Sequence, residues 1–152
     1  MRLETYYQQL SGQASAWRRR QGMPEVTREM LGRDLAVMFA HVVDLEDAIS
    51  EDDARHVEKA LADVAIDALA ALNDLAEPWC LRTPRHVPGR YQSAAAHTSN
   101  LRHRVQAVLH YWMGEQRRDT CVALELVLKS VLELASRLDL DLAISLAGRL
   151  RS

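Results

Sequence analysis

Residues 54–76 of this chain read ARHVEKALADVAIDALAALNDLA, and this stretch decides the fold. Its larger apolar residues recur at helical spacing and form one face: Val57, Leu61, Val64, Ala68 and Leu75. Residues 35–49, LAVMFAHVVDLEDAI, show the same periodicity. Two neighbouring amphipathic helices need further helices to cover their apolar faces. The sequence therefore predicts an all-α protein.

Composition extends this prediction to the whole chain. The 152 residues are 48% hydrophobic, and only six glycines and four prolines interrupt them. We expect a single domain over residues 1–152, a helical bundle of about five to six helices with a four-helix core. The formal net charge of −2 argues against a general nucleic-acid binder.

Breaks in the periodicity give the expected element bounds. Helices are predicted over about 2–21, 27–49, 53–77, 98–113, 119–138 and 141–150. Thr27 is the expected cap of the second helix, and Ser50 with Asp53 resembles a capping box for the third. Residues 78–92 hold three of the four prolines and predict one long connection between two halves.

The two halves, 25–77 and 97–150, show similar apolar spacing. LADVAIDALAALNDLA in the first resembles LELVLKSVLELASRLD in the second. A duplicated helical hairpin would account for this likeness. The alternative is that any two amphipathic helices rich in leucine and alanine look alike.

Cysteine use and hydropathy indicate the compartment. Cys80 and Cys121 lack a partner spacing, so we expect free thiols rather than a disulfide. The first residues contain no apolar core of signal-peptide length, and no run is long enough to span a membrane. We therefore expect a cytoplasmic protein that does not bind membranes.

Acidic residues occur at helical spacing on both helices of the first half. On a helical wheel, His41 and Asp44 lie at the flank of the apolar stripe of residues 35–49, and Asp47 points further toward solvent. On the next helix, a separate polar stripe contains His56, Asp63, Asp67 and Asp74. This stripe either faces solvent or turns toward His41 and Asp44, where paired acids would hold one or two divalent ions.

Trp17 to Ala76 resembles the MazG-like, all-α nucleoside triphosphate pyrophosphohydrolases. Three features carry the resemblance: the entry segment WRRRQG, an acidic helix ending in Ala-Ile, and the string LADVAIDALAALNDLA. The family's metal signature is E-x-x-E on one helix and E-x-x-D on the next. Its final Asp matches Asp63, but Ala60 stands where the preceding Glu belongs. The first pair falls on His41 and Asp44, or on Asp44 and Asp47.

The resemblance implies hydrolysis of a (deoxy)nucleoside triphosphate to the monophosphate and pyrophosphate, with Mg²⁺ or Mn²⁺ as cofactor. The implied metal ligands are Asp44, Asp47, Asp63 and Asp67, and the implied catalytic residues are His41, Asp44 and Asp63. Ala60 removes a carboxylate that such a metal site needs. The resemblance also implies a homo-oligomer, a dimer or tetramer, for which the last helix, rich in leucine and alanine, could supply an interface.

A basic segment, residues 78–114, lies between Glu77 and Glu115 and contains no acidic residue. Arginine forks suit phosphate, and neighbouring aromatic rings could stack on a base. The expected substrate-binding residues are Arg82, Arg85, Arg90, Arg102, Arg104 and, outside the segment, Trp17. Alternatively, the segment only balances the acidic helices. It could also bind nucleotide, nucleic acid or a protein partner in a catalytically inactive relative.

The sequence does not indicate a zinc site, a phosphate-binding loop or a catalytic nucleophile. Cys80, His86, His97 and His103 match no zinc spacing. No glycine-rich phosphate loop and no nucleophile elbow occur.

Overall fold

The computed structural model describes residues 3–79, 81 and 93–152. Within these ranges it contains α-helices and no strand, which confirms the all-α prediction. None of the described helices is long and apolar enough to cross a membrane. The six helices are α1 (Leu3–Arg20), α2 (Leu31–Ser50), α3 (Ala54–Asp74), α4 (Ala94–Met113), α5 (Arg117–Arg137) and α6 (Leu142–Leu150).

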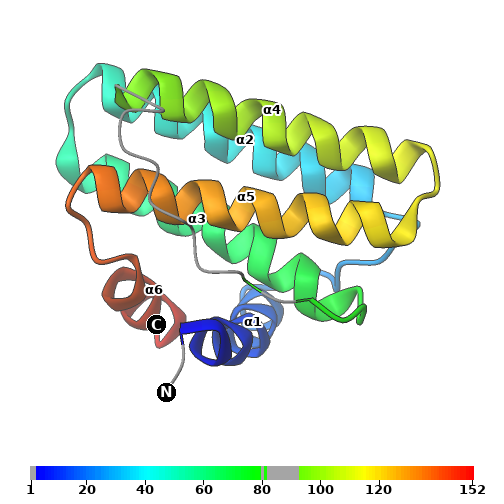
Figure 1. Ribbon diagram of the computed structural model, residues 1–152. Helices are drawn as coiled ribbons and strands as arrows, with labels where there is room; N and C mark the ends of the chain where they lie inside the picture. The colour runs from blue at the N-terminus through cyan, green and yellow to red at the C-terminus, as the bar shows by residue number, and fades with distance from the viewer. Residues whose placement is uncertain (1–2, 80, 82–92) are drawn as a thin grey trace.

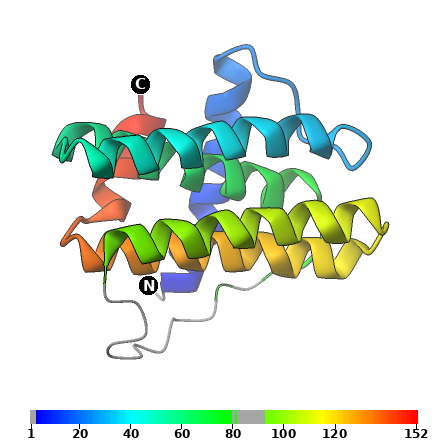
Figure 2. The same cartoon turned by 90° about the horizontal axis from the view of Figure 1, so that it is seen from above.

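The helices form three layers (Figure 1). The first layer holds α2 and α4, the second α3 and α5, and the third α1 and α6. Helix α2 packs on α3 and α4, and α5 packs on the same two helices, which gives the expected four-helix core. In Figure 2, α1 crosses beneath this core at a steep angle.

Helix α3 is the centre of the molecule. It packs against α1, α2, α5 and α6, and every residue from 60 to 72 is buried. A helix surrounded on all sides needs small or apolar side chains nearly everywhere. The alanines of α3 meet that need, because they let four neighbouring helices approach closely. The two aspartates within this stretch are therefore buried as well, whereas wheel geometry left open a stripe facing solvent.

Several helix ends differ from the sequence-based bounds. Thr27 accepts a hydrogen bond from the Met30 backbone at 3.3 Å, but the turn it closes precedes α2, which begins at Leu31. Asp53 alone caps α3, because Ser50 is still part of α2. Helix α4 begins four residues earlier than expected, at a cap formed by Ser93. Turn-forming side chains therefore marked the correct regions but not always the first helical residue.

The connection between α3 and α4 joins two helix ends that lie at opposite ends of the bundle (Figure 1). Helix α3 ends at one end of the core and α4 begins at the other, so the two helices run in the same direction (Figure 1). Such a connection is the long crossover that the prolines predicted. Leu81 is buried within it. Residues 82–92 lie outside the described part of the chain.

Trp112 of α4 contacts the start of α2 at one end of the core, and so joins the α2–α3 hairpin to the α4–α5 hairpin. Its Nε1 donates a hydrogen bond to the backbone oxygen of Arg28 at 2.5 Å. Its ring lies against Gly32 at the start of α2, where an added Cβ would come within 2.7 Å of the ring. Gly32 therefore makes room for a large aromatic side chain from α4.

Candidate functional site

A buried ion-pair network connects α1, α2 and α3. The guanidinium of Arg18 donates to Asp34 at 3.1 Å and to Asp67 at 3.2 Å. All three side chains are less than a tenth exposed. The second oxygen of Asp67 lies 2.5 Å from Nδ1 of His41. Two acidic and two basic groups therefore compensate one another inside the protein, as buried charges require.

Burial and pairing act together on the titration of this network. The hydrogen bond to Asp67 raises the pKa of His41, and the negative charge of Asp63 adds to this effect. Burial raises the pKa of Asp67 although His41 and Arg18 act in the opposite direction. Asp63, one turn earlier on α3, also raises the pKa of Asp67 because the two carboxylates are like charges.

Asp63 has its own pair of cations. Nη2 of Arg149, from α6, lies 2.5 Å from Asp63, and Nζ of Lys59 lies 3.5 Å from it. The Arg149 guanidinium also stands over the ring of Trp17, 5.6 Å from its centroid. Trp17 in turn donates to the hydroxyl of Ser152 at 3.4 Å. Asp63 therefore fixes α6 against α3, and Trp17 lies under the same arginine.

Asp44 and Asp47 lie apart from this buried cluster. Asp44 pairs with Nε2 of His56 at 2.9 Å and keeps 41% of its side chain exposed. Asp47 is exposed, and the structure gives it no ion pair within the described residues. Of the expected site residues, the fold thus brings His41, Asp63 and Asp67 together and leaves Asp44 and Asp47 toward solvent.

A divalent ion would need several oxygen ligands that converge on one point. Across the part of the chain that the structure describes, no three His, Cys, Asp or Glu side chains are placed together in that way. Three of the expected ligands already have basic partners. Asp67 contacts Arg18 and His41, Asp63 contacts Lys59 and Arg149, and Asp44 contacts His56. The arrangement fits a closed ion-pair network better than a metal centre, so we derive no chemical step through a metal. The Mg²⁺ or Mn²⁺ site stays a prediction.

The described part of the basic segment contains one arginine in an ion pair and one that is partly buried. Arg102 makes a two-pronged ion pair with Glu46 of α2, at 2.8 Å and 2.9 Å. Nε of Arg104 is buried and has no hydrogen-bond partner among the described residues. His97 is buried, and His103 is exposed. The remaining candidates of the segment lie outside the described residues: Cys80, Arg82, Arg85, His86 and Arg90.

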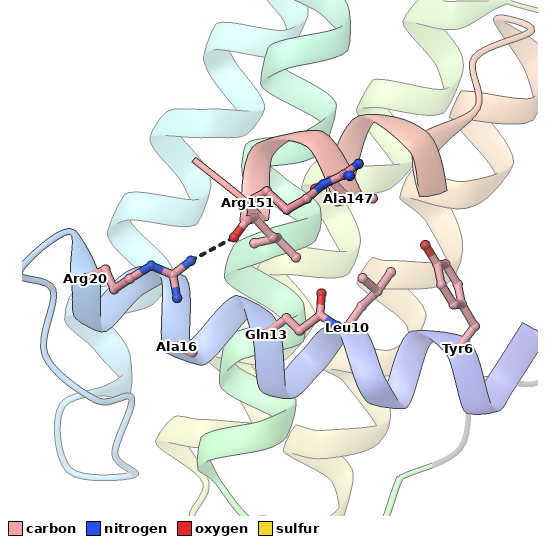
Figure 3. A pocket seen from close by; sticks show the side chains of 8 residues that line it. Tyr6, Leu10, Gln13, Ala16, Arg20, Ala147 and Arg151 are labelled. Carbon is pink, nitrogen blue, oxygen red and sulfur yellow. Dashed lines mark hydrogen bonds between the residues drawn. The ribbon is translucent and has the colours of Figure 1, made fainter.

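A cleft of about 470 Å³ lies between α1 and α6 (Figure 3). Its floor is apolar, and two arginines stand at its edge. The Arg20 guanidinium donates to the backbone oxygen of Leu150 at 2.7 Å, and Nε of Arg151 donates to that of Ala147 at 2.9 Å. Neither arginine has an acidic partner within the described residues. The lining includes Tyr6, Leu10, Gln13, Arg20, Leu150 and Arg151.

Three residues of these networks were missed by sequence reasoning. Arg18 lies in the last turn of α1 beside two other arginines, where a cation complements the helix dipole, so nothing in the sequence marks it as buried. Asp34 occupies an apolar-stripe position of α2, one turn from both Leu31 and Met38, and this spacing could have revealed it. Arg149 carried no signal, because its partner Asp63 lies 86 residues away.

Comparison with models of protein families, with curated proteins and with solved structures finds no match to this chain. The MazG-like resemblance therefore rests on the sequence motifs alone.

Proposed function

We propose that this chain is a non-catalytic helical protein that binds a nucleotide in the cleft between α1 and α6. The observation that carries the proposal is a contrast in charge compensation. The two buried aspartates of the expected metal site are already paired. Asp67 contacts Arg18 and His41, and Asp63 contacts Arg149. Arg20 and Arg151, in contrast, hydrogen-bond only to neutral backbone oxygens among the described residues. Their charges remain available to an anion.

The cleft has features that a nucleotide needs. Its volume of about 470 Å³ lies within the range of about 300–1,000 Å³ that is usual for small-molecule sites. Guanidinium groups bind phosphate oxygens well, because their planar fork matches the anion. Tyr6, which is partly exposed, offers an aromatic surface for a base. Figure 3 shows Tyr6 and Arg20 at opposite ends of the cleft, which separates the base side from the phosphate side.

Calorimetric titration with ATP, dATP, GTP and dTTP in the presence of EDTA tests this proposal. We expect saturable binding that needs no divalent ion. Arg151→Gln should weaken binding at least about tenfold, because a charged hydrogen bond contributes about 1.5–3 kcal/mol. Arg118→Gln, at an exposed position on α5, is the matched control and should bind like the wild type. Absence of binding by every nucleotide would refute the proposal.

The pyrophosphohydrolase remains the competing hypothesis, and one assay separates the two. The protein is incubated with the same nucleotides and Mg²⁺ or Mn²⁺, and pyrophosphate is measured. We expect no release above the blank. Release that disappears in Asp63→Ala would establish the hydrolase instead, because Asp63 is the one residue that matches the family's metal signature on α3.

A further inference from the structure

The outer face of α2 carries a regular stripe that none of the described helices covers. Exposed residues recur along it at alternating steps of three and four: Arg33, Ala36, Ala40, Val43 and Asp47. Val37 lies beside this stripe and is 40% exposed, and Val43 is 46% exposed. The opposite side of α2 packs on α3 and α4 (Figures 1 and 2). The stripe therefore faces away from the core.

Steps of three and four residues are the spacing of a coiled-coil seam. The middle of this seam is made of alanine and valine, so a second helix can approach closely. Elsewhere among the described residues, the most exposed large apolar side chains, Met113 and Ile144, stand at the end of α4 and on α6, respectively. An exposed apolar seam of this length is typical of a surface that packs against another helix.

The charges at the two ends of the seam identify the partner. Arg33 stands near the start of α2, and Asp44 and Asp47 stand near its end. Two copies of α2 packed in antiparallel order place Arg33 of each copy beside the acidic end of the other. Parallel packing would place like charges together. The stripe is thus complementary to itself under a two-fold rotation, which is the requirement for a symmetric dimer.

Arg33 and Asp47, the charged residues at the two ends of the stripe, can form ion pairs with another chain. Arg33 contacts Asp34 at 3.4 Å, but Asp34 is already bound to Arg18. Asp47 has no ion pair within the described part of the chain. An interchain pair between Arg33 and Asp47 would therefore displace no closely bound partner.

The last helix, α6, buries most of its large apolar side chains. Its leucines, Leu142, Leu146 and Leu150, are buried inside the chain against the core. Its one exposed large apolar side chain is Ile144, and the expectation that this helix offers an interface stays a prediction.

We propose that two copies of this chain form a symmetric dimer through antiparallel α2 helices, with Ala40 near the two-fold axis. Light scattering coupled to size exclusion should give the mass of a dimer for the wild type. Ala40→Glu should give a monomer, because two carboxylates would meet at the axis. Ile144→Glu makes the same change on α6 and should leave the dimer intact. A wild-type protein that stays monomeric up to its solubility limit overturns the proposal.

Charge exchange tests the antiparallel order. Arg33→Glu and Asp47→Arg should each raise the dissociation constant of the dimer several-fold, since each variant places like charges together. The double variant should restore the wild-type constant. A double variant as weak as the single ones would contradict this packing. Ala40→Cys should form a disulfide-linked dimer under mild oxidation, whereas Ile144→Cys, with the same two native cysteines, should not.

The dimer does not depend on nucleotide binding, and the two proposals fail separately. A monomer that binds nucleotide refutes the dimer alone. A dimer that releases pyrophosphate in an Asp63-dependent reaction refutes the non-catalytic function alone.

Discussion

The α2–α3 hairpin and the α4–α5 hairpin occupy equivalent places in the core but bury different chemistry. The first buries three aspartates, Asp34, Asp63 and Asp67. The polar residues that the described part of the second buries carry no carboxylate: His97, Thr98, Thr120 and Ser130. Both hairpins contribute apolar side chains to the same central core. Apolar packing is therefore shared by the two hairpins, and buried carboxylates are confined to one of them among the described residues.

This difference explains why the third layer lies where it does. Buried carboxylates need cations, and neither helix of the first hairpin supplies enough of them. Arg18 comes from α1 and Arg149 from α6, and both helices pack on α3. The hairpin with the buried aspartates thus packs on two covering helices through α3, whereas the helices of the second hairpin pack mainly on each other and on α2 and α3. The duplication of the halves stays a hypothesis, and any such duplication does not extend to this chemistry.

The largest effect should come from removing the buried cation that joins α1 to the first hairpin. Arg18→Met leaves Asp34 and Asp67 without their shared partner, and breaking such a buried pair costs about 3–5 kcal/mol. Arg102→Met makes the same change on the second hairpin, where the pair with Glu46 is more exposed and contributes about 0–1 kcal/mol. Urea unfolding measures the loss of unfolding free energy in both variants. Equal losses of stability would show that the contrast between the hairpins has no energetic basis.

An intermediate effect is expected where the hairpins meet. Gly32→Ala places a Cβ within 2.7 Å of the Trp112 ring, so the ring must move and strain its hydrogen bond to Arg28. Overpacking of this kind costs about 1–3 kcal/mol. Gly148→Ala is the control, because an added Cβ there meets nothing within 4 Å. If both variants unfold at the same urea concentration, Trp112 does not join the two hairpins as described.

The smallest effect should be the dependence of stability on pH through His41, whose ring is partly exposed. Because Asp67 raises the pKa of His41 above 6.5, the protonated ring stabilises the folded state below pH 6.5. This contribution is lost as pH rises through the raised pKa. His41→Gln should flatten the fall of the unfolding free energy above pH 6.5, whereas His103→Gln on α4 should not. A wild-type curve that rises over this range would reverse the sign of this linkage.

Local patterns predicted much of the fold because they depend on neighbouring residues. Apolar periodicity located the six helices, and capping side chains and prolines located the connections. Errors appeared at the start of α2, where the Thr27 cap closes a turn outside the helix, and at the start of α4, which begins earlier than expected at its Ser93 cap. The site was predicted less well, because His41, Asp63 and Asp67 could be recognised as polar but their cationic partners could not.

The sequence by itself determined that this chain forms amphipathic helices and that α3, rich in alanine, has an unusually small cross-section. Only the tertiary structure decided how its acidic residues are compensated, because Asp67 and Asp63 meet Arg18 and Arg149 across separations of 49 and 86 residues. Helical periodicity is a local property, since each turn is fixed by residues three or four apart. The partner of a buried charge is set by which distant helix packs nearby, and that choice depends on the whole chain.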